Sequence, residues 1–234
     1  MEAFCIVLVA LSTLLWAGFA LLPWRPWATR EVLDAIEGTD GDALLEDITV
    51  VIPARNEAEV IEQTLKSVVK QGTSLRIILV DDNSEDATAQ KVHQMRISNL
   101  LMIQSRALPD NWSGKLWALE QGRLHVTTPY TLLLDADIEL DRGIVKTLRE
   151  KMLEHGIPFI SLMAVPWMAR SWEKMLMPAF VYFFKILYPF LRVNSQDTKM
   201  AAAAGGCILM ETRLLDQIGG FASIKSAVID DCAL

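Results

Sequence analysis

Two aspartates one residue apart follow a short, mostly apolar segment in the middle of the chain. Residues 130–134 have the length and composition of a strand buried on both faces, and Asp135 and Asp137 come directly after it. Side chains alternate along a strand, so both carboxylates can point the same way at its carboxyl end. Ligands bind at that edge of open α/β sheets, and paired carboxylates suit Mg²⁺ or Mn²⁺ shared with phosphate oxygens. The segment therefore predicts a divalent-metal site that also takes a phosphorylated ligand.

The Asp-x-Asp pattern is weak on its own and depends on its context. About one such match is expected by chance in a chain of this aspartate content, and Asp40 and Asp42 form one with no strand before it. Two earlier strand-like segments, 47–52 and 75–80, also run into polar residues. These are Asn56 and Glu57 after the first segment and Asp81 and Asp82 after the second. Three polar clusters at one edge of a parallel sheet predict a site for a nucleotide and a metal.

Helices are expected to follow the first two strands. Asn56 with Glu59 three residues later predicts a capping box at the start of the first helix. Asn83 and Ser84 are expected to cap a second helix over 85–95. Strands that alternate with helices predict an α/β fold with a mostly parallel sheet flanked by helices.

Lys115 begins a third predicted helix, over 115–125. The helix dipole disfavours a cation at this end unless an anion lies there, so Lys115 is a candidate nucleotide-binding residue. The chain has no GxGxxG fingerprint, and the glycine that a Walker A motif requires upstream of Gly114 is missing. These absences argue against dinucleotide-binding enzymes and P-loop NTPases.

Composition excludes further classes. The net charge of −7 argues against a nucleic-acid partner, and it is concentrated in residues 31–47, which hold acidic residues and no Lys or Arg. Cys5, Cys207 and Cys232 are far apart and have no metal-ligand spacing. A disulfide framework or a zinc site is therefore not expected, and a reducing compartment is favoured.

The N-terminal segment is long and apolar enough to cross a membrane. Residues 3–22 carry no charge and span about the thickness of a bilayer core. Two tryptophans with Arg25 and Arg30 follow, which indicates a cytoplasmic interface. We predict a transmembrane anchor at 1–24, an acidic linker at 25–47 and a domain at 48–234 that faces the cytoplasm from the inner membrane. A buried core helix is the alternative for the first segment.

A second apolar segment lies within the predicted domain, at 171–192. It is short for a membrane span, and Pro178 and Pro189 bracket its middle. It is interpreted either as a buried core helix or as a helix in the membrane interface beside a lipid acceptor. The small residues that follow at 201–206, which include Gly205 and Gly206, allow a ligand to come close and are assigned to the acceptor side.

Several segments in order resemble glycosyltransferases of family 2, which have the Rossmann-like GT-A fold. The general motifs are residues 51–57, 79–84 and 134–137, and the resemblance covers about 48–234 plus the anchor. Further segments resemble more narrowly the hopanoid biosynthesis-associated glycosyltransferases. They are residues 111–118, 178–184, 201–207 and 229–234.

The resemblance implies a role for each matching residue. Pro53, Arg55 and Glu57 would line the nucleotide pocket, and Asp82 would bind the uracil or ribose end. Asp135 would contact the ribose or the metal-bound diphosphate, and Asp137 would bind Mg²⁺ or Mn²⁺. Asp231 would be the general base, preceded by Asp230 where many relatives have Glu.

The resemblance implies transfer of a sugar from a nucleotide-diphosphate donor, a UDP-sugar, to a lipid acceptor, and its narrower part implies a hopanoid. One base and no enzymic nucleophile imply a single displacement with inversion. A metal-dependent nucleotidyltransferase and a nucleotide-binding scaffold without turnover stay open as alternatives. Relatives continue beyond the position of Leu234, so the chain resembles a C-terminally truncated form that is expected to bind nucleotide and metal but to turn over poorly.

Overall fold

The computed structural model describes residues 2–23, 25, 27–28, 31–35, 45–195 and 200–225. The chain divides into two compact units. The first combines residues 1–33 with 166–202, and the second combines residues 34–165 with 203–234. The second unit contains every strand that the described residues form, and it holds the candidate site.

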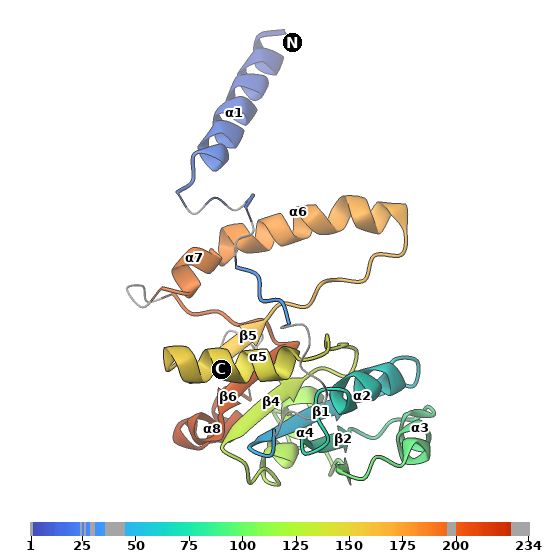
Figure 1. Cartoon of the computed structure of the whole chain (residues 1–234). Helices are drawn as coiled ribbons and strands as arrows, with labels where there is room; N and C mark the ends of the chain where they lie inside the picture. The colour runs from blue at the N-terminus through green and yellow to red at the C-terminus, as the bar shows by residue number, and fades with distance from the viewer. Residues whose placement is uncertain are drawn as a thin grey trace. The chain divides into compact units, whose positions relative to one another are not determined.

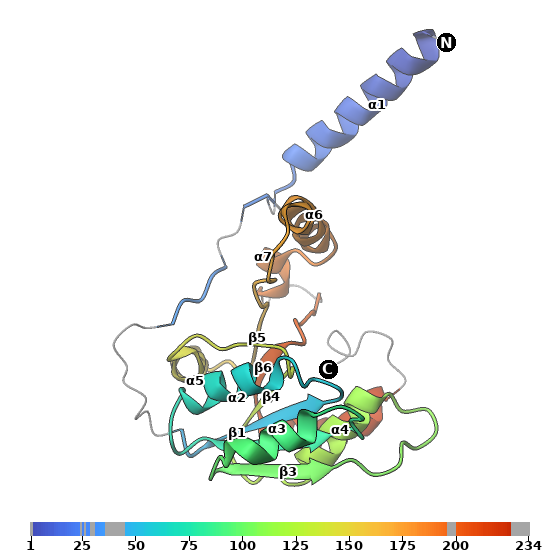
Figure 2. The same cartoon turned by 90° about the vertical axis from the view of Figure 1, so that its right-hand side faces the viewer.

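The second unit is built on a mixed six-stranded sheet with the order β3-β2-β1-β4-β6-β5. Figure 1 labels these strands except β3, which is labelled in Figure 2. Strands β1 to β4 pair in parallel, and β6 runs antiparallel to both of its neighbours. The bounds are β1 Ile48–Ala54, β2 Arg76–Asp81, β3 Leu100–Gln104, β4 Tyr130–Leu134, β5 Phe159–Leu162 and β6 Cys207–Glu211. The predicted α/β class with a mostly parallel sheet is confirmed.

The strand order places a switch point between β1 and β4. The chain moves outward from β1 through β2 to β3 and then returns to the other side of β1 as β4. Connections leave the carboxyl ends of β1 and β4 in opposite directions, and open α/β sheets commonly bind their ligands at such a point. The residues that follow these two strands are therefore well placed to bind a ligand.

Helices cover both faces of the sheet (Figure 2). Helix α4 packs on one face so closely that a Cβ at Gly122 would lie 2.5 Å from Val51 Cγ1, and Leu116 and Phe221 join the same buried cluster. Helices α2 and α5 lie on the opposite side. The helical bounds are α2 Ile61–Val69, α3 Thr88–Met95, α4 Gly114–Arg123, α5 Ile144–His155, α8 Thr212–Ile218 and the 3₁₀ helix η1 Gly220–Ile224.

The predicted starts of α2 and α3 were wrong, and one loop contact explains both. Asn56 has φ 58° and caps no helix; its N–H donates to Ser84 Oγ at 3.0 Å and its Oδ1 accepts from Glu85 N–H at 2.8 Å. The two side chains expected to cap their own helices instead join the loop after β1 to the loop after β2. Helix α2 consequently begins at Ile61 and α3 at Thr88, without side-chain caps.

Strand β1 also runs two residues further than predicted, through Pro53 to Ala54. Proline has no N–H to donate to a ladder. Beyond Val51, however, β1 pairs only with β2, so the strand continues with one neighbour.

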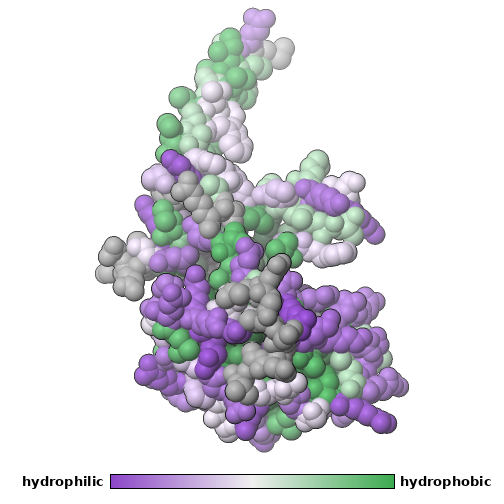
Figure 3. Space-filling model, in the orientation of Figure 1, coloured by the Kyte–Doolittle hydropathy of each residue, from purple (hydrophilic) through white to green (hydrophobic). Residues whose placement is uncertain are grey.

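The first unit contains α1 Glu2–Ala20, α6 Ser171–Leu187 and α7 Phe190–Val193. Helix α1 has no buried residue, and hydrophobic side chains dominate its surface (Figure 3). Among the described residues, α1 and the combined segment Ser171–Val193 are long and apolar enough to cross a membrane. The second segment is interrupted, because α6 ends before Tyr188 and Pro189 precedes α7.

Candidate functional site

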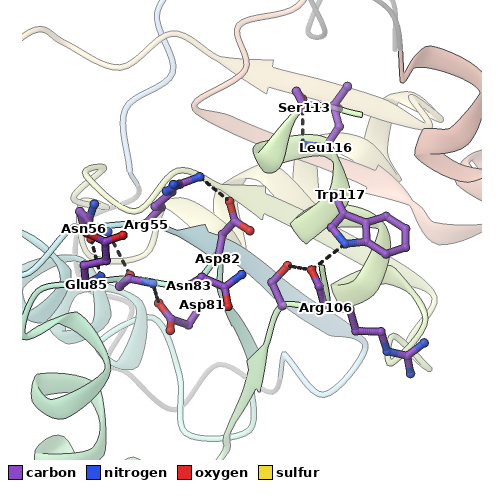
Figure 4. A network of polar contacts seen from close by, with 12 residues as sticks. Arg55, Asn56, Asp81, Asp82, Asn83, Glu85, Arg106, Ser113, Leu116 and Trp117 are labelled. Atoms are coloured by element: carbon purple, nitrogen blue, oxygen red, sulfur yellow. Dashed lines mark hydrogen bonds and ion pairs between the residues drawn. The ribbon is translucent and has the colours of Figure 1, made fainter. Parts of the chain in front are cut away.

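Arg55 and Asp82 come together at the carboxyl ends of β1 and β2 (Figure 4). Arg55 Nη1 lies 3.5 Å from Asp82 Oδ2, and the N–H of Asp82 donates to the Ala54 carbonyl at 2.8 Å. Asp82 is only 7% exposed, whereas the arginine side chain is largely exposed. The carboxylate is thus fixed while the guanidinium can meet a ligand.

The first turn of α4 closes over Asp82. A Cβ at Gly114 would lie 2.5 Å from Asp82 Oδ2, so only glycine leaves room for the carboxylate there. Ser113 caps the helix by accepting from the Leu116 N–H at 3.3 Å. A helix N-terminus stabilises a carboxylate in this position. Sequence reasoning missed this role of Gly114, for which the only signal is a glycine at a helix start.

Lys115 and Asp135 form an ion pair at the same edge. Lys115 Nζ lies 2.7 Å from Asp135 Oδ1, and both side chains are partly exposed. The Asp135 N–H donates to the Gly206 carbonyl at 3.0 Å, and a Cβ at Gly206 would lie 3.3 Å from Ile138 Cδ1. The predicted acceptor-side residue Gly206 therefore lies beside a predicted donor residue, and Gly205 precedes it in the same turn.

The loop that carries Asp137 is fastened to α2 and to the turn after it by three polar side chains. Thr64 Oγ1 donates to the Ala136 carbonyl at 2.7 Å, Ser67 Oγ accepts from Leu140 N–H at 3.0 Å, and Gln71 Nε2 donates to the Asp141 carbonyl at 3.0 Å. All three side chains are buried. Sequence reasoning missed them, although polar residues at helical spacing, at Thr64 and Ser67 within α2 and at Gln71 just after it, were a usable signal.

Glu57 shows that negative charge is concentrated here. Burial, followed by the negative charges of Asp137, Asp86 and Asp135, raises the pKa of the Glu57 carboxyl above its ordinary value. Its N–H donates to Thr88 Oγ1 at 2.8 Å, which holds the residue beside α3. A cation near Asp135 and Asp137 would relieve this repulsion.

The carboxylates fit a divalent cation that also binds a diphosphate. No group of three or more His, Cys, Asp or Glu side chains with metal-binding proximity occurs in the described part of the chain. Mg²⁺ generally takes only one or two carboxylates together with substrate phosphates and water, so the chemistry of Asp135 and Asp137 is compatible with such an ion. Burial, and then the charge of Asp135, raises the pKa of the Cys207 thiol to about 12, so this neighbour stays protonated.

The candidate catalytic residues Asp230 and Asp231 lie outside the described residues. The last described element before them is η1, which α4 holds in place. Glu120 Oε2 accepts from the Phe221 N–H at 2.9 Å, Glu120 Oε1 lies 2.7 Å from Arg123 Nη2, and Arg123 Nη1 lies 2.9 Å from Asp216 Oδ1. Helix α4 therefore contacts Asp82 and Asp135 at its N-terminus and anchors η1 near its C-terminus.

We expect Glu120→Ala to lower the free energy of unfolding by roughly 1–3 kcal/mol, because it leaves the Phe221 N–H without its acceptor and leaves Arg123 with Asp216 as its carboxylate partner. The measurement is urea unfolding of the detergent-solubilised protein followed by tryptophan fluorescence. Arg213→Ala is the control, since the Arg213 side chain is largely exposed and its ion pair with Glu211 should contribute less than about 1 kcal/mol. Equal losses in the two variants would contradict the anchoring role.

We expect Gly114→Ala to weaken UDP binding about tenfold, because the added methyl group displaces the Asp82 carboxylate. Calorimetric titration with UDP measures the effect. Gly18→Ala makes the same substitution in a helix where no atom lies within 4 Å of the new Cβ, and it should leave UDP affinity unchanged. An unchanged affinity in Gly114→Ala would show that Asp82 does not contact the nucleotide.

Sequence similarity extends through this site. Residues 49–219 match the family model described as glycosyl transferase family 2. The chain is 28% identical over 126 residues to a 4,4'-diaponeurosporenoate glycosyltransferase of Staphylococcus haemolyticus, which covers 53% of this chain and 33% of that protein. It is 31% identical over 104 residues to the protein of that name from Staphylococcus aureus strain bovine RF122 / ET3-1. This second alignment covers 44% of this chain and 27% of that protein. The chain thus matches about a third or less of the length of these relatives.

Solved structures share the architecture at low sequence identity. A mannosyltransferase from Pyrobaculum calidifontis in complex with GDP-Man and Mn²⁺ superimposes with a TM-score of 0.64 at 19% identity, over 99% of this chain and 61% of that chain. S. aureus TarS 1-349 in complex with UDP-GlcNAc gives a TM-score of 0.51 at 18% identity, over 74% and 47%. At these identities the likeness shows the fold alone, and it confirms the predicted GT-A fold.

Proposed function

The chain belongs to glycosyl transferase family 2, and we propose that it transfers a sugar from a UDP-sugar donor to a lipid acceptor. The observation that carries the proposal is the convergence of two pairs on the start of α4. Arg55 with Asp82 meets Gly114, and Asp135 pairs with Lys115. At the switch point of the sheet, the Asp82 carboxylate can accept hydrogen bonds from a nucleoside, and the Lys115 ammonium group can bind a diphosphate.

The nucleoside and the diphosphate are assigned to different parts of this edge. Pro53, Arg55, Glu57 and Asp82 would hold the nucleoside end, with Asp82 accepting from the base or the ribose. Asp135 and Asp137 would hold Mg²⁺ or Mn²⁺, and Lys115 would meet the phosphate oxygens. When bound, the cation neutralises the charge that develops on the leaving diphosphate.

The transfer step needs one base. We assign it to Asp231, with Asp230 beside it in sequence. The Asp231 carboxylate takes the proton of the acceptor hydroxyl as that oxygen bonds to the anomeric carbon. The bond from the anomeric carbon to the phosphate oxygen breaks, nucleoside diphosphate leaves, and the configuration inverts.

A lipid acceptor and a membrane location are supported by separate features. The relatives from Staphylococcus are named for transfer to 4,4'-diaponeurosporenoate, and the resemblance at 111–118 and 201–207 favours a hopanoid. Helix α1 is long and apolar enough to anchor the protein. Arg25 and Arg30 after α1 favour a location of the catalytic unit on the cytoplasmic side of the inner membrane.

The test combines donor binding with product analysis. Calorimetry with UDP and GDP, each with Mn²⁺ or EDTA, should show metal-dependent binding that prefers UDP. Mass spectrometry of lipids from cells with and without the gene should show a glycolipid that depends on it. Release of pyrophosphate would instead identify a nucleotidyltransferase. Donor binding with no difference in lipids between cells with and without the gene would identify a scaffold without turnover. Either result overturns the proposal.

A further inference from the structure

Helix α6 exposes a continuous apolar face. At 100° per residue, six large apolar side chains fall within an arc of about 140°, and each is more than half exposed. Lys174 and Lys185 project from the opposite side of the helix. The six residues, which we call the α6 apolar face, are Trp172, Met175, Leu176, Phe180, Phe183 and Leu187.

The connectivity of the sheet shows that this helix does not cross a membrane, although the combined segment Ser171–Val193 has the length and hydropathy to do so. Strand β5 ends at Leu162, β6 begins at Cys207, and these two residues are paired in one antiparallel ladder. Both ends of the intervening chain must therefore lie on the same side of a bilayer. A single crossing by α6 would separate them.

No return crossing is available after α6. Between β5 and β6, the described residues form only α6 and the four-residue α7 as regular structure. Non-helical backbone does not cross lipid, since its polar groups would lack partners. The four residues outside the description there, 196–199, reach at most about 14 Å when extended, which is half a bilayer core.

The polar side of α6 is tied to the chain that follows α1. Lys185 is 4% exposed, and its Nζ donates to the Ala28 carbonyl. Ala28 comes eight residues after the end of α1 at Ala20. With α1 as a membrane anchor, Ala28 lies near the membrane surface, and the bond from Lys185 holds α6 at the same level.

We propose that α6 lies in the plane of the membrane interface, with the α6 apolar face in the lipid and its lysine-bearing side turned away. Residues 166–195 contain four basic residues and one acidic residue in a chain of net charge −7, which favours anionic headgroups. Trp172 is at the start of the face, and tryptophan prefers the headgroup level. This inference is independent of donor chemistry and holds whether or not the protein transfers a sugar.

The test measures how deep labelled positions of α6 lie in the bilayer. The full chain is reconstituted in vesicles of phosphatidylcholine and phosphatidylglycerol in a ratio of about 3:1. Cys5→Ser and Cys232→Ser remove two thiols, while Cys207 is buried. Single cysteines at Leu176, Phe183 and Leu187 are labelled with an environment-sensitive fluorophore, and Lys174→Cys is the matched control on the opposite side. These three apolar sites are exposed, so their substitution removes little packing, and far-ultraviolet circular dichroism with a thermal unfolding scan checks each variant for folding.

Labels on the α6 apolar face should share one shallow depth. Spin-labelled lipids should quench the fluorescence of all three labels, and the depths calculated from this quenching should agree to within a few ångström. Aqueous iodide should quench only the label at Lys174→Cys. A depth that passes through the bilayer centre from Leu176 to Leu187 would show a crossing helix. Quenching of all four labels by iodide would show that α6 does not contact the membrane. If neither quencher reaches the three apolar-face labels, and the unlabelled cysteine variants form disulfide-linked dimers, a second copy of the chain covers this face. Each of these outcomes overturns the proposal.

Discussion

Asp137→Asn should weaken UDP binding in Mn²⁺ on the order of 10²-fold while leaving binding in EDTA almost unchanged. The substitution keeps the shape of the side chain and removes one anionic oxygen ligand. Loss of a residue that only orients a metal ligand costs 10–100-fold in other sites, so loss of a direct ligand belongs at the upper end of that range. The measurement is calorimetric titration of UDP under both conditions.

Glu139→Gln is the matched control for this effect. Glu139 lies two residues further along the same loop and lines a different surface groove, between that loop and α2. It should lose less than twofold in affinity under either condition. Equal losses in Mn²⁺ and in EDTA for Asp137→Asn would show that this aspartate shapes the loop rather than binding a cation.

The strands and the site edge could be predicted because their causes are local. A buried parallel strand is a continuous apolar run, and the polar residues that follow it must lie at its carboxyl end. The strand at 130–134 before Asp135 was placed correctly on these grounds, and the strand predicted at 75–80 before Asp82 lies one residue later, at Arg76–Asp81. Arg55 was placed beside the same edge by resemblance, and the structure brings it to Asp82.

What could not be predicted depends on contacts between distant parts of the chain. Asn56 has the side chain of a helix cap, but the neighbouring loop offers it Ser84 and Glu85, and tertiary bonds override the local preference. The antiparallel direction of β6 is set by its pairing with β4 and β5, which are distant from it in the sequence. The residues of β6 carry no periodic pattern that indicates this direction. The requirement for glycine at position 114 exists only because Asp82 from another strand lies against it.

The ion pair between Lys115 and Asp135 implies that these residues change partners when the donor arrives. Without a ligand, the ammonium group lies 2.7 Å from an oxygen that the proposed cation needs. A divalent cation brings its own positive charge, which repels the lysine. The diphosphate supplies the anion that the lysine then meets. The affinity of the protein for the metal is therefore expected to be higher when the nucleotide is bound than when it is absent.

Lys115→Met should consequently change two affinities in opposite directions. UDP binding in Mn²⁺ should fall about tenfold, because a charge-assisted contact with phosphate is lost. Binding of Mn²⁺ without nucleotide should become tighter by on the order of tenfold, because a competing positive charge leaves Asp135. Calorimetry with UDP and electron paramagnetic resonance of free Mn²⁺ measure the two quantities separately.

Lys66→Met controls for the loss of a lysine elsewhere, since Lys66 pairs with Glu62 at 4.0 Å on α2 and should change neither affinity. A fall in both affinities for Lys115→Met would show that the lysine supports the fold of the edge rather than competing with the cation. A fall in UDP affinity with unchanged Mn²⁺ binding would place the cation away from Asp135, on Asp137 alone. The opposite signs follow only if one carboxylate serves Lys115 in the free protein and the metal in the donor complex.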